Sequence, residues 1–195
     1  MQRILGFAAV ALLLAAAGWW VRLPARAVLA PVAAAPGAAI DSLNGVVVYN
    51  NGGFGAKHGR NVVDGYNVGL KYQCVEFVKR YYLERFDHRM PNSYGHAKDF
   101  FDSTVADGAL NPARALRQFR NGSATKPAAE DLLVLGPWSG NPYGHVAIIS
   151  RVGDGEVEVV QQNTGNTRNT YDLDLIDGHW RISSPRVLGW LRRAP

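Results

Sequence analysis

Cysteine is nearly absent from this 195-residue sequence, in which Cys74 is the only example. A single thiol excludes an internal disulfide, and in an oxidising compartment it is also a chemical liability. Cys74 is therefore either a small, inert core residue or a nucleophile. The residues around it must distinguish the two.

The sequence also lacks runs of like charge. Its net charge of +5 includes three arginines near the N-terminus, Arg3, Arg22 and Arg26, where there is no acidic residue. Without them, the sequence has 18 basic and 16 acidic residues, a net charge of +2. Nucleic-acid binding draws its affinity from concentrated phosphate contacts, so we expect no nucleic-acid partner.

The N-terminal part has few polar residues. An apolar run of eighteen residues, Ile4 to Val21, follows a basic start and precedes Ala25-Arg26-Ala27. This order is typical of a secretory signal with an A-x-A cleavage site, although the run is also long enough for a membrane anchor. We expect a signal peptide or anchor over 1–27, an Ala/Pro tether over 28–40 and one domain over 41–195. The protein would then be periplasmic, secreted or anchored at the outer face of the inner membrane.

The pattern of the remaining chain predicts one clear helix and several strands. Val75, Val78, Tyr82 and Phe86 recur at steps of three and four residues, which indicates a helix from Cys74 to about Phe86 with one buried face. The other predicted elements are a strand and glycine-rich turn over 45–55, a second helical stretch over 96–105, a strand over 132–135, a hairpin centred on 153–155, and a closing strand within "RVLGWLRR". This order favours an α+β fold with an antiparallel sheet. Nothing in the sequence requires more than a monomer, which is the state we expect.

Cys74 lies at the predicted helix start. Unpaired backbone N–H groups and the positive end of the helix dipole lie there, and both favour a thiolate. We therefore expect the pKa of Cys74 to fall from about 8.5 toward neutrality. The same N–H groups can hold an oxyanion, and Gln73, directly before the thiol, is a second oxyanion candidate or simply a helix cap.

A cysteine nucleophile needs a base, and His145 is the best placed of the five histidines. It begins the strand "GHVAII" directly after a glycine-rich loop, where its side chain can reach a cleft. The hairpin then supplies a third group. If its turn is centred on Asp154, His145 lies opposite Asn163 and Ala147 opposite Gln161, with Gln162 on the other face.

An amide beside the imidazole would suit a Cys-His-Asn arrangement, in which it orients the ring. Alternatively, the three amides over 161–163 are only a polar strand end that runs into a loop. A helix-start Cys, a strand-start His and a hairpin-paired amide, in that chain order, favour catalysis.

The segments "YQCVEF", "GHVAII" and "VVQQN" resemble the CHAP family of cysteine- and histidine-dependent amidohydrolases and peptidases. The similarity is closest to the amidase domains of bifunctional glutathionylspermidine synthetase/amidases and extends over 44–192. It implies a papain-like fold of the NlpC/P60-CHAP type, with Cys74 as nucleophile, His145 as general base and acid, and no cofactor. The family commonly has Glu where this chain has Gln161. An amide cannot stabilise an imidazolium as a carboxylate does, so either Asn163 takes that part or activity is reduced.

Three functions remain open. An exported cysteine amidase or endopeptidase would cleave peptidoglycan through a thioester. The second is an amidase for glutathionylspermidine-like polyamine amides, which export disfavours. The third is a catalytically weakened cell-wall-binding module that stacks sugars on exposed aromatic residues, with Trp138, Tyr143 and Trp180 as the candidates.

Other polar residues have simpler interpretations. Neither His58 and Asp64 with His145, nor Asp172, Asp174 and Asp177, match a known metal-ligand spacing, so no metal is expected. Glu76 and Arg80 are four residues apart and predict a solvated helix pair. Tyr81 and Tyr82 are expected to serve packing.

Overall fold

The computed structural model describes residues 34–53 and 55–194. The predicted leader over 1–27 and the first part of the tether lie outside these ranges, so they stay predictions. Within the described residues, no helix combines the length and apolar character that crossing a membrane requires.

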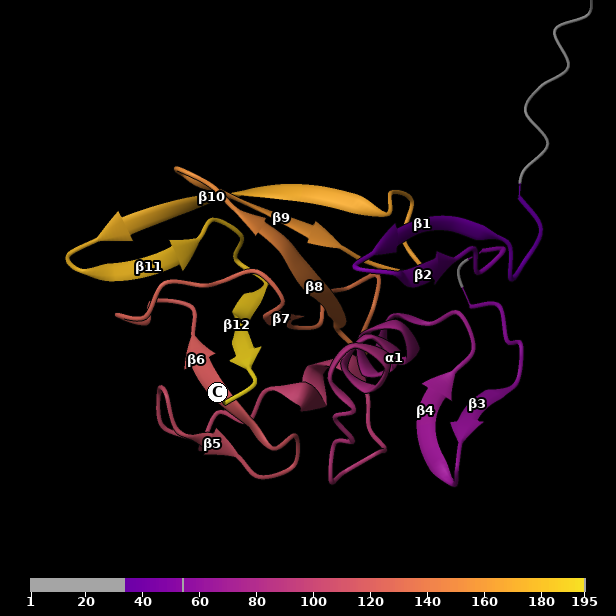
Figure 1. The fold of residues 1–195 in the computed structure, drawn as a ribbon. Helices are drawn as coiled ribbons and strands as arrows, with labels where there is room; N and C mark the ends of the chain where they lie inside the picture. Colours follow the sequence, from indigo (N-terminus) through magenta and orange to yellow (C-terminus); the bar gives the residue numbers. More distant parts are fainter. Residues whose placement is uncertain (1–33, 54, 195) are drawn as a thin grey trace, which may run out of the picture. The chain divides into compact units, whose positions relative to one another are not determined.

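The described domain consists of one α-helix, a 3-10 turn and twelve strands (Figure 1). Eight strands form one antiparallel sheet in the order β11-β10-β9-β8-β7-β12-β6-β5, and two hairpins, β1–β2 and β3–β4, stand apart from it. The elements are β1 (Ala39–Leu43), β2 (Val46–Tyr49), β3 (Arg60–Val63), β4 (Tyr66–Leu70), α1 (Cys74–Phe86), η1 (Ala97–Phe100), β5 (Leu110–Asn111), β6 (Leu116–Arg120), β7 (Leu132–Leu135), β8 (His145–Val152), β9 (Glu156–Val160), β10 (Arg168–Ile176), β11 (His179–Ile182) and β12 (Val187–Arg192).

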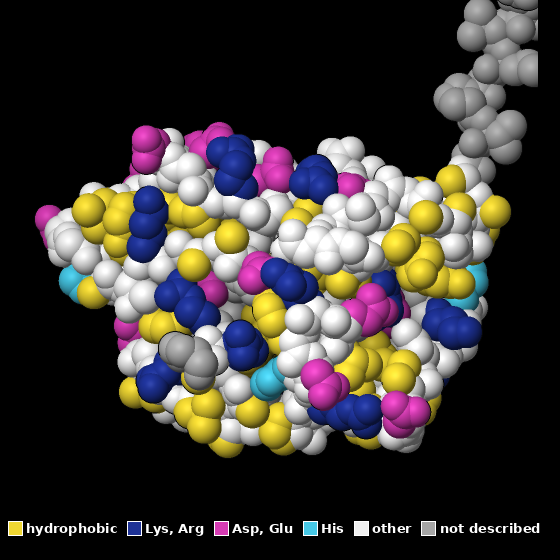
Figure 2. Space-filling model, viewed as in Figure 1, with side chains coloured by type: hydrophobic (Ala, Val, Ile, Leu, Met, Phe, Trp, Pro, Cys, Tyr) yellow, Lys and Arg dark blue, Asp and Glu magenta, His cyan; other side chains and the backbone are white. Residues whose placement is uncertain are grey.

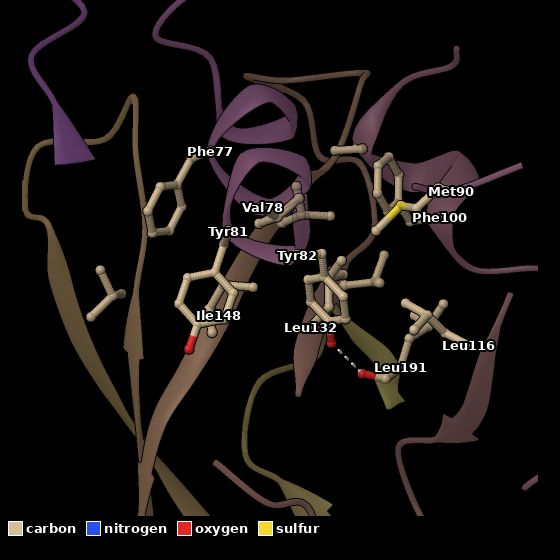
Figure 3. Close-up of a cluster of buried hydrophobic side chains, with 14 of the residues drawn as sticks. Phe77, Val78, Tyr81, Tyr82, Met90, Phe100, Leu116, Leu132, Ile148 and Leu191 are labelled. Atoms are coloured by element: carbon tan, nitrogen blue, oxygen red, sulfur yellow. Dashed lines mark hydrogen bonds between the residues drawn. The ribbon is translucent and has the colours of Figure 1, made fainter. Parts of the chain in front are cut away.

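Helix α1 begins at Cys74 as predicted, but it buries more than one stripe. Phe77, Val78, Tyr81 and Tyr82 have no exposed surface. By area alone, full burial of side chains of this size contributes about 1.5–3 kcal/mol each. Figure 3 shows these rings projecting from the helix among side chains of the sheet, with the Tyr82 hydroxyl donating to the carbonyl of Leu191. The two tyrosines therefore serve packing, as expected.

The helix is covered on further sides because it also contacts β2 and β4. Gly69 of β4 permits this approach: a Cβ at Gly69, whose φ is +145°, would lie 3.0 Å from the Cα of Glu76. Glu76 and Arg80 consequently form a buried ion pair with an Nε–Oε1 distance of 2.7 Å. The predicted solvated pair was wrong, because the two hairpins that cover it lie outside the helix pattern.

Strands β7 and β8 are buried on both faces, and they separate two hydrophobic cores. Leu132, Val134, Val146 and Ile148 pack with α1 in the first core. The alternate residues of both strands join a second core that draws on both ends of the sheet, from β9–β11 and from β6 and β12. The sheet must therefore curl around this second core, whose largest fully buried side chain is Trp190.

The second helical stretch, expected over 96–105, is only the 3-10 turn η1. Its N-terminal end is closed by the His96 N–H, which donates to Asp99 Oδ2 at 2.7 Å, and by the Asp99 N–H, which donates to the His96 carbonyl at 3.1 Å. Asp102 then accepts hydrogen bonds from both the backbone N–H and the hydroxyl of Thr104. Because these local hydrogen bonds compete with those of a continuing helix, the element ends after one turn.

Candidate active site

Cys74 is the first residue of α1. Gln73 before it is extended, with φ −88° and ψ 161°, and its side chain does not cap the helix. The first N–H groups of a helix have no partner within it, so the backbone at Cys74 offers donors to a bound group. The residue is half-buried, and its side chain packs against the first core.

Burial raises the pKa of the Cys74 thiol, whereas the backbone N–H groups of Val146, Val75 and Cys74 itself favour the thiolate and oppose that shift. The predicted fall of this pKa was wrong, because the loss of water around the sulfur outweighs the helix-start donors. The neutral thiol is therefore favoured over the thiolate. The contribution of Val146 also places the thiol beside the residue that follows His145.

His145 lies at the start of β8, where it pairs with Leu135 of β7. The preceding Gly144 makes this entry possible: its φ is +74°, and a Cβ there would lie 2.6 Å from the carbonyl oxygen of Leu135. Only 7% of His145 is exposed. Burial lowers its pKa to about 4; the hydrogen bond with Gln161 opposes this shift, and the charge of Arg186 adds to it.

The hydrogen bonds around Gln161 define which nitrogen of His145 carries the proton. Gln161 Nε2 donates to the carbonyl of Asn166 at 3.1 Å, so its Oε1 faces His145 Nε2 at 3.0 Å. Because this oxygen can only accept, the neutral ring is protonated at Nε2. The lone pair is on Nδ1, which is the nitrogen available to take a proton from a thiol.

The hairpin register agrees with the prediction near the site. Ile148 pairs with Val160 and Ile149 with Val159, as a turn centred on Asp154 requires, and a bulge follows at Ser150. The ladder ends at Val160, however, so the predicted pairing of His145 with Asn163 does not form. Gln161, the diagonal neighbour, lies against the ring instead.

Asn163 turns away because its backbone is left-handed, with φ 64°. Its Nδ2 donates to Gln73 Oε1, and its Oδ1 accepts from Asn51 Nδ2 at 2.8 Å. Gln73 Nε2 in turn donates to the carbonyl of Ala56 at 3.0 Å. Because the Ala56 carbonyl can only accept, Gln73 must present its NH2 group to it and its oxygen to Asn163. The orientations of Asn163 and Asn51 then follow in turn. Asn163 thus positions Gln73 rather than the imidazole.

Gln162 points to the opposite face from Gln161, as the register predicted. Its Nε2 donates to the Gln73 carbonyl at 3.1 Å and to Glu76 Oε2 at 2.9 Å, and its Oε1 accepts from the Tyr49 N–H at 2.7 Å. This side chain fastens the segment after β9 to the start of α1. The sequence analysis did not predict this structural role of Gln162. The only signal in the sequence was an amide directly after a strand.

A cavity of about 280 Å³ adjoins these amides. It lies between the segment after β2 and the segment after β9, and its lining includes Tyr49, Asn51, Gln161 and Asn163. Neither Cys74 nor His145 is among its lining residues, so the cavity adjoins the site through Gln161 and Asn163.

The remaining candidates divide between surface and structure. Trp138 and Tyr143 are exposed, whereas Trp180 is half-buried with Lys126 over its ring. His58 Nε2 is hydrogen-bonded to the carbonyl of Asn51. Within 34–53 and 55–194, no three His, Cys, Asp or Glu side chains are grouped to hold a metal.

Comparison with known proteins gives a family match. The family model of the CHAP domain matches residues 64–163. Trypanothione synthetase of Crithidia fasciculata is 35% identical over 129 residues, which are 63% of this chain and 20% of that protein. Bifunctional glutathionylspermidine synthetase/amidase of Escherichia coli is 31% identical over 149 residues, covering 68% and 23%. The chain thus spans about a fifth of the length of these curated relatives.

Among solved structures, Ly7917 aligns over 63% of this chain and 54% of its own, with 21% identity and a TM-score of 0.40.

Proposed function

Because this chain belongs to the CHAP domain family of cysteine amidohydrolases and peptidases, we propose that it hydrolyses an amide bond of peptidoglycan outside the cytoplasm. The fold, α+β and papain-like with a cysteine-bearing helix on an antiparallel sheet, is that of the family. The observation that carries the proposal is that α1, which begins at the Cys74 thiol, contacts β8, which begins at His145 with its Nδ1 unprotonated. Export rests on the pattern of residues 1–27.

The proposed reaction begins from neutral groups. His145 Nδ1 takes the thiol proton as Cys74 Sγ attacks the amide carbonyl, and a C–S bond forms. The negative charge moves to the carbonyl oxygen. The Cys74 backbone N–H and the second proton of Gln73 Nε2 are the donors proposed to stabilise it. Gln161 holds the ring while it is an imidazolium.

His145 then returns the proton to the leaving nitrogen, the C–N bond breaks, and an amine departs from a thioester. A water molecule attacks the thioester carbonyl and gives its proton to His145 Nδ1. The C–S bond breaks, the carboxylate product leaves, and the proton returns to Cys74. One water is consumed, and one amine and one carboxylate are produced.

The test is digestion of purified peptidoglycan by the full-length protein in ¹⁸O-labelled water, with fragments identified by mass spectrometry. We expect new amines and new carboxylates that carry ¹⁸O. The Cys74→Ala variant should lose at least about 10³-fold in rate, as other enzymes do without their nucleophile. Equal release by both proteins would refute the assignment of Cys74, and no release by either would refute the substrate.

A second substrate is favoured by the relatives themselves, two of which are named for glutathionylspermidine or trypanothione synthesis. An amide between a peptide carboxyl and a polyamine would react by the same steps. Incubation with glutathionylspermidine distinguishes the two, because free spermidine would appear only if the site accepts a polyamine as leaving group. If both substrates are bound but neither is cleaved, the weakened wall-binding module becomes the better description.

A further inference from the structure

Arg186 stands at the same end of the sheet as His145. Leu135 at the end of β7 pairs with His145 on one side and with Val187 on the other. Arg186 directly precedes Val187, and its carbonyl accepts a hydrogen bond from the Gly136 N–H at 2.7 Å. The guanidinium is close enough to His145 for its charge to lower the pKa of the ring.

The Arg186 guanidinium lies over an aromatic ring. Its Cζ lies 4.3 Å from the centroid of the Trp138 ring, and 38% of Trp138 is exposed. Trp138 belongs to a tight turn that precedes His145 and is closed by paired backbone hydrogen bonds with Asn141. Stacking covers one face of a guanidinium and leaves the N–H groups along its edge free to donate.

Within the described residues, Arg186 is one of the arginines that form no ion pair. Six other arginines there form eight ion pairs with carboxylates, for example Arg192 with Asp131 at 2.7 Å. In the described ranges, no carboxylate lies within 4.0 Å of Arg186. Arg186 is half-buried. A guanidinium without a carboxylate partner can pair with an anionic group of a ligand.

Without a bound anion, the Arg186 charge opposes the proposed reaction. The proposed reaction passes through a protonated His145, and a nearby positive charge destabilises that state. A negative charge on the substrate, bound to Arg186, would remove the repulsion at the moment the imidazolium forms. The arrangement is thus suited to an anionic substrate and unsuited to a neutral one.

We propose that Arg186, held by Trp138, binds a free carboxylate of the substrate, so that the protein selects peptide amides with an acidic group near the scissile bond. A guanidinium edge matches a carboxylate through two parallel hydrogen bonds. This inference rests on the proposed amide hydrolysis. It adds a substrate preference that the Cys74 and His145 chemistry does not require.

The test uses two synthetic stem tetrapeptides, one with free carboxylates and one with every carboxylate converted to a carboxamide. Cleavage of each is measured with the full-length protein and with Arg186→Gln, Arg186→Lys and Trp138→Leu. Lys126→Gln is the matched control, because Lys126 also lies over a tryptophan, Trp180, with 4.7 Å between Nζ and the ring centroid.

We expect Arg186→Gln to lower kcat/KM for the acidic peptide by roughly 10- to 100-fold, the usual range for a lost charged hydrogen-bonded pair. The amidated peptide should show no fall and should gain rate, because Arg186→Gln removes the charge that repels the imidazolium. Lys126→Gln should change neither peptide. Arg186→Lys should retain part of the preference, since it keeps the charge but not the fork. An equal fall for both peptides, or no fall for either, would overturn the inference.

Binding separates this inference from the proposed function. In a Cys74→Ala background, calorimetry should show tighter binding of the acidic peptide than of the amidated one, and addition of Arg186→Gln should abolish the difference. If the intact protein cleaves neither peptide, the proposed function fails, and this difference in affinity still decides the role of Arg186. Equal affinities in the Cys74→Ala protein would rule out the carboxylate site.

Discussion

Gln161 occupies the place where a charge would affect the reaction most. Its amide selects the tautomer of His145 but brings no negative charge to the imidazolium. Burial and Arg186 both act against protonation of the ring. Both groups are thus favoured in their neutral forms, and in the proposed reaction His145 takes up a proton only as the thiol attacks. Both pKa directions lead to the same conclusion, since each group is held in its uncharged form.

Replacing Gln161→Glu should change the pH dependence. A carboxylate against Nε2 stabilises the imidazolium and should raise the pKa of His145 from about 4 by about 1–3 units. The acidic limb of kcat/KM should move up by the same amount, which a pH series on one peptide substrate would measure. Some stability should be lost, because the new carboxylate would face the carbonyl of Asn166 in place of an NH2 group.

Gln161→Leu is the control for this experiment, since it removes the hydrogen bond without adding charge. It should lower kcat and should not move the acidic limb upward. An unchanged limb in Gln161→Glu would mean that His145 does not govern the acidic side of the profile.

At the scale of the element, α1 is tied to its surroundings by a buried polar group. Glu76 Oε1 accepts from Arg80 Nε at 2.7 Å and from Asn61 Nδ2 at 2.9 Å, and its Oε2 accepts from Gln162. Arg80 also donates to the Val47 carbonyl and lies over the Tyr49 ring. One carboxylate therefore joins the helix to β3 and to the segment after β9, next to the thiol.

Glu76→Gln should destabilise the protein by about 3–5 kcal/mol, because it leaves Arg80 buried without its counter-ion. Urea unfolding measures the change. The double variant Glu76→Gln/Arg80→Met should recover part of the loss, since no uncompensated charge remains. A loss below about 0.5 kcal/mol for Glu76→Gln, the range of an exposed pair, would show that the pair is solvated after all.

At the scale of the whole described domain, β7 and β8 belong to both cores, so neither core can unfold while the other keeps its strands intact. The site lies at the end of these strands. A buried group there, such as His145, should therefore regain its ordinary pKa only when the whole domain unfolds. On the face shown in Figure 2, basic and acidic side chains are interspersed. Surface charge there is mixed. A buried group such as His145, whose pKa differs between the folded and unfolded states, should therefore contribute measurably to the pH dependence of the free energy of unfolding.

His145 should make the protein less stable in acid. Its pKa is about 4 when folded and about 6.5 when unfolded, so only the unfolded chain binds this proton between those values. The free energy of unfolding should fall as the pH is lowered from about 6.5 to 4, by about 3 kcal/mol in total from this residue. Above pH 6.5 the contribution is constant.

Denaturant unfolding of the wild-type protein and of His145→Gln at pH 7, 5.5 and 4.5 checks the sign and the size. The variant should show a flatter dependence over this interval, whatever its stability at pH 7. Parallel curves for the two proteins would contradict a depressed pKa at His145.

Much of the fold and the two reacting residues were predictable because they depend on local pattern. The helix from Cys74, the strand over 132–135, the hairpin after His145 and its register all follow from periodicity and turn residues, which act over a few neighbours. The family resemblance was legible in the same short segments, and the CHAP match agrees with it. Local pattern also placed an amide beside His145.

Tertiary structure alone decided the rest, because it depends on which surfaces exclude water and where a ladder ends. Termination of β9 at Val160 made Gln161 rather than Asn163 the partner of His145. Coverage of α1 by the hairpins buried Glu76 with Arg80. Burial of the thiol reversed the expected shift of the Cys74 pKa, despite the opposing effect of the Val146 N–H. The sequence by itself determined the thiol, the imidazole and the amides that follow β9. Packing determined which amide meets the imidazole and which charge states are favoured, since desolvation is a property of the assembled fold.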